Sequence, residues 1–221
     1  MSITVTTVAT HTDMTTLTHV KAMLGITNST DDTLLDALID QASDLIRKYC
    51  GRIFEQETIT ENLPGTGTTR LTLERTPIVS VASVKVNDSA ITASEFTIED
   101  PDAGLLLRHD DGAPPSPASW ALPGRLSDGL SLHLRHQSRS NNIEVKYVGG
   151  YKMPKDSASD FPRDIEQACV DLVKATYLHR QDDPRVRTQK IGDASETLVT
   201  EAQLPPAAKD ILDRWRRIYL T

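Results

Sequence analysis

Histidines in the middle of the chain are the residues whose type best suits a metal ion. His133 and His136 are separated by two residues, and His109 precedes them. The surrounding alternation predicts a β-strand over residues 130–135, and side chains three positions apart on a strand point to opposite faces. His133 and His136 therefore cannot easily share one ion, and we predict no metal site.

A group of carboxylates in the same region could suggest calcium. These side chains are Glu99, Asp100, Asp102, Asp110 and Asp111. Calcium loops place their oxygen ligands at regular spacing, with a glycine for the sharp turn and a terminal glutamate. The group lacks that pattern, so solvated turns are the better interpretation.

Catalytic and cofactor patterns are equally weak. Cys169 and His179 lie ten residues apart on one predicted helix, too far for the hydrogen bond that activates a nucleophile, and no serine occupies a nucleophile elbow. Gly65-Thr66-Gly67 is not followed by the lysine or the strand-to-helix transition of a phosphate loop. We expect no cofactor and no enzymatic activity.

The composition is that of an ordinary soluble protein. The 221 residues carry a formal net charge of −7 with a pI near 5.3, which argues against a free nucleic-acid binder. We expect no membrane span, because no segment approaches the ~18 consecutive apolar residues that one needs. The N-terminus lacks a basic start and an apolar run, and two cysteines do not make a disulfide scaffold, so we expect a cytoplasmic protein with reduced thiols.

The clearest element is a helix over residues 31–51. Ser29 or Thr30 could cap its first amides, and Gly51 suits a left-handed stop. Asp36, Asp40 and Asp44 fall on the face opposite an apolar stripe. That stripe comprises Leu34, Leu35, Leu38, Ile39, Ala42, Leu45, Ile46 and Tyr49.

A second amphipathic helix begins after Pro162. Its apolar residues repeat at intervals of three and four from Ile165 to Tyr177, and this stripe is the natural partner of the helix over 31–51. A shorter helix over residues 15–23, ended by Gly25, completes a helical hairpin near the N-terminus.

The section between these helices is rich in β-patterns. Ile78 to Val86 alternates with a slip between Val81 and Val84, which predicts a bulge, and Asn87-Asp88 predicts a turn. Residues 109–129 hold several prolines and glycines and predict an exposed loop. The predicted strands cover residues 57–63, 70–73, 78–86, 95–98, 104–108, 130–135 and 142–148.

The chain ends leave alternatives open. Residues 1–14 could form a short strand or a loose arm, and residues 182–204 predict a long polar loop or arm. A last helix follows Pro205-Pro206. Its Trp215 and arginines could simply pack on the core and complement the helix C-terminus, or they could form an interface, because Trp, Tyr and Arg anchor binding hot spots.

These elements predict an α+β fold. Helices from both ends of the chain form a bundle, and the middle forms an inserted antiparallel β-sheet or small β-barrel. The expected divisions are residues 1–56 for the N-terminal helical hairpin, 57–160 for the inserted β-rich section, 161–181 for the second core helix that completes the bundle, and 182–221 for the C-terminal arm and helix.

Five segments in this order resemble one family. They are VKAMLGI, DDTLLDALIDQASDLIRKYCGR, LERTPIVSVASVKV, NIEVKYVGGY and FPRDIEQACVDLVKATYLHR. Together they resemble the head-to-tail adaptor (connector, or head-completion) proteins of long-tailed double-stranded-DNA phages, over roughly residues 17–181. No single segment is diagnostic, and it is their order that carries the resemblance.

The resemblance implies a structural protein of the virion neck, assembled in the bacterial host cytoplasm. Such adaptors form a homo-oligomeric ring, usually of twelve copies, under the portal protein, where they extend the DNA channel and dock the stopper or tail. The net negative charge of the chain agrees with a channel through which double-stranded DNA passes without binding tightly.

The resemblance also suggests where the partners bind. In such relatives the C-terminal helix or arm commonly reaches the portal, which implies portal-interface candidates at Arg214, Trp215, Arg216, Arg217 and Tyr219. If subunits stand side by side in a ring, Asp36, Asp40 and Asp44 could face a neighbouring subunit or the channel.

A second hypothesis belongs to another class. The β-rich section could be a tail or baseplate module that binds a host surface or carbohydrate through the 109–129 loop, with Trp120 as an exposed anchor. Hydrophobic anchoring of that loop on the sheet by Trp120 is the favoured interpretation of the same residue.

Overall fold

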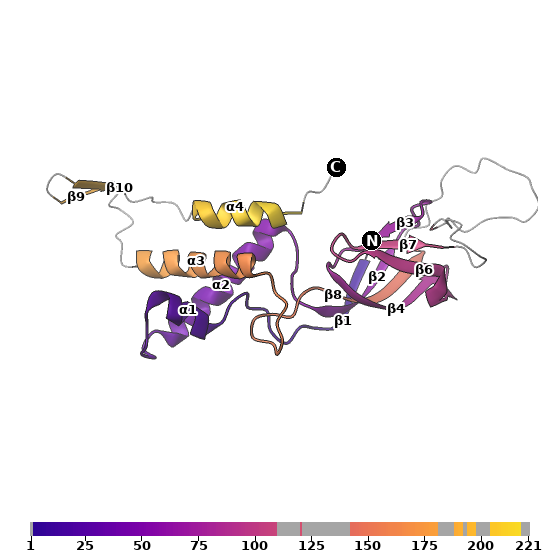
Figure 1. Cartoon of the computed structure of the whole chain (residues 1–221), viewed down its shortest axis with the longest axis horizontal. Helices are drawn as coiled ribbons and strands as arrows, with labels where there is room; N and C mark the ends of the chain where they lie inside the picture. The colour runs from indigo at the N-terminus through magenta and orange to yellow at the C-terminus, as the bar shows by residue number, and fades with distance from the viewer. Residues whose placement is uncertain are drawn as a thin grey trace, which may run out of the picture. The chain divides into compact units, whose positions relative to one another are not determined.

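The computed structural model of the chain (Figure 1) describes residues 2–109, 120, 142–180, 188–191, 194–197 and 204–217. The chain divides into two compact units. The sheet unit comprises Met1–Thr10 and Ile53–Tyr151, and the helical unit comprises His11–Arg52 and Lys152–Thr221. Helices and antiparallel sheets are both present, which confirms the predicted α+β class.

The sheet unit contains two antiparallel sheets. The larger has the strand order β1-β2-β8-β4-β5, and the smaller has the order β3-β7-β6. A short 3-10 helix, η1 (Ala93–Glu95), precedes β6. The strands are β1 (Ser2–Thr7), β2 (Glu57–Leu63), β3 (Arg70–Thr72), β4 (Ile78–Val86), β5 (Ser89–Ile91), β6 (Phe96–Asp100), β7 (Leu105–Arg108) and β8 (Ile143–Gly149).

Strand β4 has the irregularity that its sequence predicts. Its pairing with β8 shifts register between Ile78 and Ser80 and again between Val81 and Ser83. The turn after it is also as predicted, because Asn87 and Asp88 both have positive φ, at 51° and 64°. Two such residues form the tight hairpin turn whose twist suits antiparallel strands.

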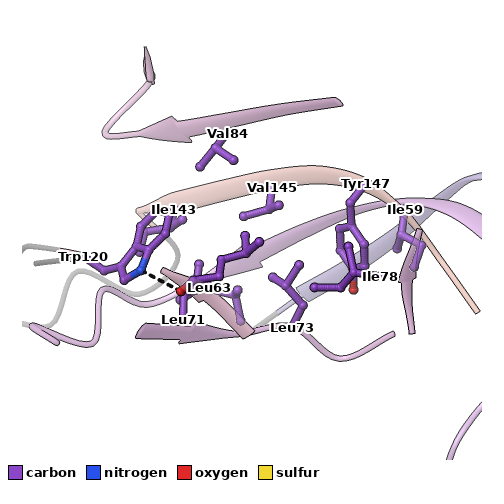
Figure 2. Close-up of a cluster of buried hydrophobic side chains, with 11 residues drawn as sticks. Ile59, Leu63, Leu71, Leu73, Ile78, Val84, Trp120, Ile143, Val145 and Tyr147 are labelled. Carbon is purple, nitrogen blue, oxygen red and sulfur yellow. Dashed lines mark hydrogen bonds between the residues drawn. The ribbon is translucent and has the colours of Figure 1, made fainter. Parts of the chain in front are cut away.

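One apolar core lies between the two sheets of this unit. Alternate side chains of β2 and β8 are buried, as the period of a strand requires. Figure 2 shows the resulting cluster, with side chains from both sheets in one group. It comprises Ile59, Leu63, Leu71, Leu73, Ile78, Val84, Leu106, Trp120, Ile143, Val145 and Tyr147.

Trp120 belongs to this core. Its side chain is fully buried, and its indole Nε1 donates a hydrogen bond to the carbonyl oxygen of Leu106 at 3.3 Å. Its backbone N–H also donates to the carbonyl of Thr68 at 2.7 Å. The favoured interpretation of Trp120 is confirmed, and the hypothesis of an exposed anchor is wrong at this residue. The predicted strand over 130–135 and most of the 109–129 loop lie outside the described residues.

A polar network is buried beside the apolar core. The hydroxyl of Tyr147 donates to Glu61 Oε2 at 2.7 Å and accepts the backbone N–H of Arg75 at 2.9 Å. The same carboxyl oxygen accepts the backbone N–H of Glu74 at 3.0 Å. Burial, together with the charge of Glu61, raises the pKa of the Tyr147 phenol, so the hydroxyl remains a donor at physiological pH. The network ties the turn before β4 to β2 and β8.

We expect Tyr147→Phe to destabilise the sheet unit by about 1–3 kcal/mol, because buried polar groups then lose their partner. Urea unfolding followed by circular dichroism measures the change. Tyr177→Phe is the matched control, because its hydroxyl bonds Asp31 at a less buried position of the helical unit. An equal effect of both substitutions would contradict the importance of the buried network.

The helical unit contains four helices. They are α1 (Leu17–Leu24), α2 (Asp32–Cys50), α3 (Arg163–His179) and α4 (Pro206–Trp215). Helix α2 packs on α3 as predicted, α4 lies alongside α3, and α1 contacts both α2 and α3 (Figure 1). Their buried apolar residues include Val20, Leu35, Ile39, Ala42, Ile46, Ile165, Ala168, Leu172, Val173, Ala208 and Leu212.

The ends and the apolar stripe of α2 differ in part from prediction. Gly51 ends the helix in the left-handed conformation as expected, at φ 63°. The N-cap is Asp31 and not Ser29 or Thr30, and its carboxyl accepts the hydroxyl of Tyr177 on α3. Leu34 and Leu45 are 40% and 45% exposed. The predicted stripe is wider than the face that the other helices cover, so these two leucines lie at its uncovered margin.

The structure describes parts of both ends of the chain, where the sequence left the conformation open. Residues 2–7 form β1, which pairs with β2, so they lie in the sheet unit and not in the helical hairpin over 1–56 that the sequence suggested. Within the predicted 182–204 arm, β9 (Thr188–Ile191) and β10 (Ala194–Thr197) form an antiparallel hairpin. Its short, polar strands lack the apolar alternation that reveals a strand in a sequence.

None of the helices in the described ranges has the length and the apolar composition that crossing a membrane requires.

Candidate assembly surface of the helical unit

The three predicted aspartates lie on one exposed face of α2. Asp36, Asp40 and Asp44 follow one another at intervals of four residues, away from the buried side of the helix. The face is therefore acidic and available for contact, as the sequence indicates. Its electrostatics depend on residues that the sequence pattern does not reveal.

Asp40 shares a hydrogen bond with Asp13, which precedes α1. This hydrogen bond raises the pKa of Asp40 above its ordinary value, and burial and the charge of Asp13 raise it further. Burial would also raise the pKa of Asp13, but hydrogen bonds to Lys155 and Asp40, with the charges of Lys155 and Arg47, hold it below its ordinary value. Lys155 Nζ lies 2.5 Å from Asp13 Oδ2. Asp40, in the middle of the face, is thus linked to the segment before α1 through Asp13, and through Asp13 to Lys155.

Asp44 has a partner on its own helix. It forms an ion pair with Arg47, one turn later, and Arg47 Nη2 donates to the carbonyl oxygen of Thr12 at 2.5 Å. Asp36 is exposed, and its charge helps to raise the pKa of Asp40 and of Lys155. Part of the acidic charge is therefore neutralised within the unit.

We expect Asp40→Asn to stabilise the protein at pH 7 by at most about 0.5 kcal/mol, because it removes repulsion from Asp13 at an exposed site. The raised pKa lets the native state hold a proton that the unfolded chain has released, so wild-type stability falls as the pH rises through that pKa. The gain should shrink near pH 3, where both states are protonated. Urea unfolding at both pH values measures it, with Asp36→Asn as the control that removes a charge from the same face and leaves the hydrogen bond between Asp13 and Asp40 in place. A gain that is independent of pH would contradict the assignment.

The predicted portal residue Trp215 is bound within the helical unit. Its indole Nε1 donates to Asp164 Oδ2 at 2.8 Å, and the guanidinium of Arg52 lies 5.6 Å from its ring centroid. The side chain is half-buried. This geometry favours the packing interpretation of Trp215 over a free interface residue.

The arginines at the end of α4 differ in their surroundings. Arg214 is exposed. Arg216 is also exposed, with its guanidinium 5.7 Å from the ring centroid of Tyr49. The backbone N–H of Arg217 donates to the carbonyl oxygen of Cys50 at 2.8 Å. Tyr219 lies outside the described residues. The structure thus presents Arg214 and Arg216 outward and ties the backbone of Arg217 to the end of α2.

The two cysteines are buried on helices. Burial raises the pKa of Cys50 to about 11 and that of Cys169 to about 12, so both remain thiols at neutral pH. Across the part of the chain that the structure describes, His, Cys, Asp and Glu side chains nowhere gather in a group of three that could hold a metal ion. His133 and His136 are outside that part.

Part of the chain is similar to a known protein family. The model of the head completion protein family matches residues 13–118, just under half of the sequence. Over this range the chain is similar to the head completion protein family. The matched part of the chain includes α1, α2 and strands β2 to β7, and so draws on both units.

Solved structures share its fold over the full length. The first match comes from the neck of an empty gene transfer agent (GTA) particle computed with C6 symmetry, at a TM-score of 0.56. Two others come from the virion of a native GTA particle and from the neck of a native GTA particle computed with C12 symmetry, at 0.57 and 0.54. Each has 14% sequence identity, and each alignment covers 100% of this chain and 98% of the other. No curated protein matches the sequence.

Proposed function

We propose that this protein is a head completion protein that forms a ring under the portal of a phage head, where it extends the DNA channel and docks the stopper or tail. The observation that carries the proposal is the fold similarity over 100% of this chain to chains in particle necks, computed with C6 or C12 symmetry. The family match over residues 13–118 supports the same class of protein. In this proposal the protein acts without catalysis and assembles in the host cytoplasm.

The acidic face of α2 supports a ring-facing role. Asp36, Asp40 and Asp44 are exposed, although Asp40 and Asp44 also have partners within the unit. We assign this face to a neighbouring subunit or to the channel. A negative surface would let DNA pass without the phosphate contacts that make DNA binding tight.

The end of α4 provides the surface that we assign to the portal. Arg214 and Arg216 present two exposed cations, while Trp215 positions the helix end through Asp164. Trp215 in this assignment is a positioning residue and not a contact. The alternative host-binding module loses its anchor, because Trp120 is fully buried.

The proposal is tested with heads that contain packaged DNA but lack this protein. Purified protein should co-sediment with these heads and allow added tails to attach, so that infectious particles form. A heat-unfolded sample is the control for nonspecific sedimentation. Failure of a folded protein to bind the heads would overturn the proposal.

A further inference from the structure

Strand β1 is an open edge of the five-stranded sheet. It pairs with β2 on one side and ends the strand order on the other. Five of its six residues are exposed, including Ile3 at 38%, and Val8 just after it is 70% exposed. Its outer backbone groups and part of its apolar surface are therefore accessible.

This edge lacks the features that usually prevent pairing with another strand. The sequence of β1, SITVTT, contains no charged residue and no proline. Natural sheets protect exposed edges with lysine, proline, marked bulges or very short strands, because an unprotected edge pairs with other chains. The opposite edge, β5, spans only three residues. The register shift between Val5 and Thr7 is the one irregularity of β1 pairing, and it leaves Ser2 to Val5 regular.

The hairpin of β9 and β10 is a pair of strands without a larger sheet to join. The two strands form a two-stranded sheet of their own, separate from both sheets of the sheet unit. An isolated two-stranded hairpin is marginally stable in water at best. The hairpin would gain stability by joining a larger sheet.

We propose that the outer edge of β1 binds the β9–β10 hairpin of a second copy of this chain. In the single chain, β1 and the hairpin lie in separate sheets. Pairing between copies would give the edge of β1 a neighbouring strand and would join the hairpin to a larger sheet. Strand addition of this kind takes its affinity from backbone hydrogen bonds, so the uncharged, threonine-rich edge is sufficient. The register places Ile3 opposite Glu61, so both side chains lie on the same face of the sheet, where Glu61 is buried. A strand added next to β1 would extend this face and cover the side chain of Ile3.

The contact joins two different surfaces of the same chain. Such a heterologous contact repeats from copy to copy and closes into a ring when the rotation permits. Eight residues separate α3 from β9 and eight separate β10 from α4, and at about 3.3 Å per residue eight residues reach at most roughly 26 Å. The inference rests on the proposed function only for the closure into a ring.

Engineered cysteines test the contact, since both native cysteines are buried. Thr4→Cys protein is mixed with Gln189→Cys or Ser195→Cys protein, in solution and on heads, and then oxidised. We expect a mixed disulfide dimer with at least one partner, at least tenfold above that formed by the exposed control Ala103→Cys. Adding Thr4→Lys protein as an unlinked competitor should not reduce this dimer, because its charged edge cannot pair, whereas wild-type protein should reduce it.

Three results would overturn the inference. The first is no mixed dimer above the control on heads that have bound the protein. The second is dimerisation of Thr4→Cys alone as readily as in the mixtures, which would indicate pairing between two β1 strands. The third is cross-linking only within one chain of a Thr4→Cys/Gln189→Cys variant. If the protein binds heads but forms no mixed dimer, the inference fails and the proposed function stands. If the mixed dimer forms in solution but the protein does not bind heads, the inference stands and the proposed function fails.

Discussion

Trp120→Ala should destabilise the sheet unit by about 3–5 kcal/mol, the cost typical of removing a large buried aromatic side chain. Trp120 is fully buried in the cluster of Figure 2, and its indole nitrogen bonds the carbonyl of Leu106. The substitution leaves a cavity and removes that hydrogen bond. The guanidinium of Arg108, 5.7 Å from the ring centroid, also loses its aromatic neighbour.

Denaturant unfolding followed by circular dichroism measures this loss. Trp120→Phe is the matched control, because it keeps an aromatic ring in the core and should cost less than Trp120→Ala. Tryptophan fluorescence of the wild type should show one emission component shielded from a soluble quencher. A loss below about 1 kcal/mol for Trp120→Ala would contradict the burial of this residue.

Removal of residues 204–221 should abolish binding to the portal. The deletion removes α4, whose Ala208 and Leu212 are fully buried and whose Trp215 bonds Asp164 on α3. The helical unit should also lose stability, since truncating one buried leucine typically costs about 2–5 kcal/mol. Pull-down by the portal protein, alongside circular dichroism, measures both effects.

A charge-reversal variant separates binding from folding in this experiment. Arg214→Glu with Arg216→Glu changes exposed side chains and leaves Ala208, Leu212 and Trp215 in place. We expect near-native stability and at least a tenfold loss of portal affinity. Full portal binding by the truncated protein would contradict the role assigned to the last helix.

Local patterns were sufficient to predict the helices and the tight turns. The apolar spacing in α2 and α3 predicts two faces that require cover, and these helices do pack together. Gly51 and the Asn87-Asp88 pair have the left-handed conformations that their residue types favour. In each of these cases, neighbours in the sequence determine the structure.

Side chains that meet across long sequence separations could not be predicted in this way. Lys155 bonds Asp13 from 142 residues away, and Tyr147 bonds Glu61 from 86 residues away. The second pair depends on the register of β2 against β8, which tertiary packing sets. A glutamate in an alternating strand gives no sign of facing inward until its partner is known.

The candidate surfaces show the same limit. Composition identifies Trp215 and its neighbouring arginines as interface material, but Asp164 and Arg52, from other segments of the helical unit, hold the tryptophan within the unit. Sequence periodicity likewise assigns Leu34 and Leu45 to a buried stripe, although the other helices cover a narrower face of α2. Which face of a helix is free depends on the packing of every neighbour.

The central claim is a ring at the head vertex, and electron microscopy tests it most directly. Purified protein is mixed with heads that lack it, and the particles are imaged by negative staining. We expect added ring-shaped density at one vertex of each head, beneath the portal. Density at every vertex, density on the tail or baseplate, or no added density would contradict the claim.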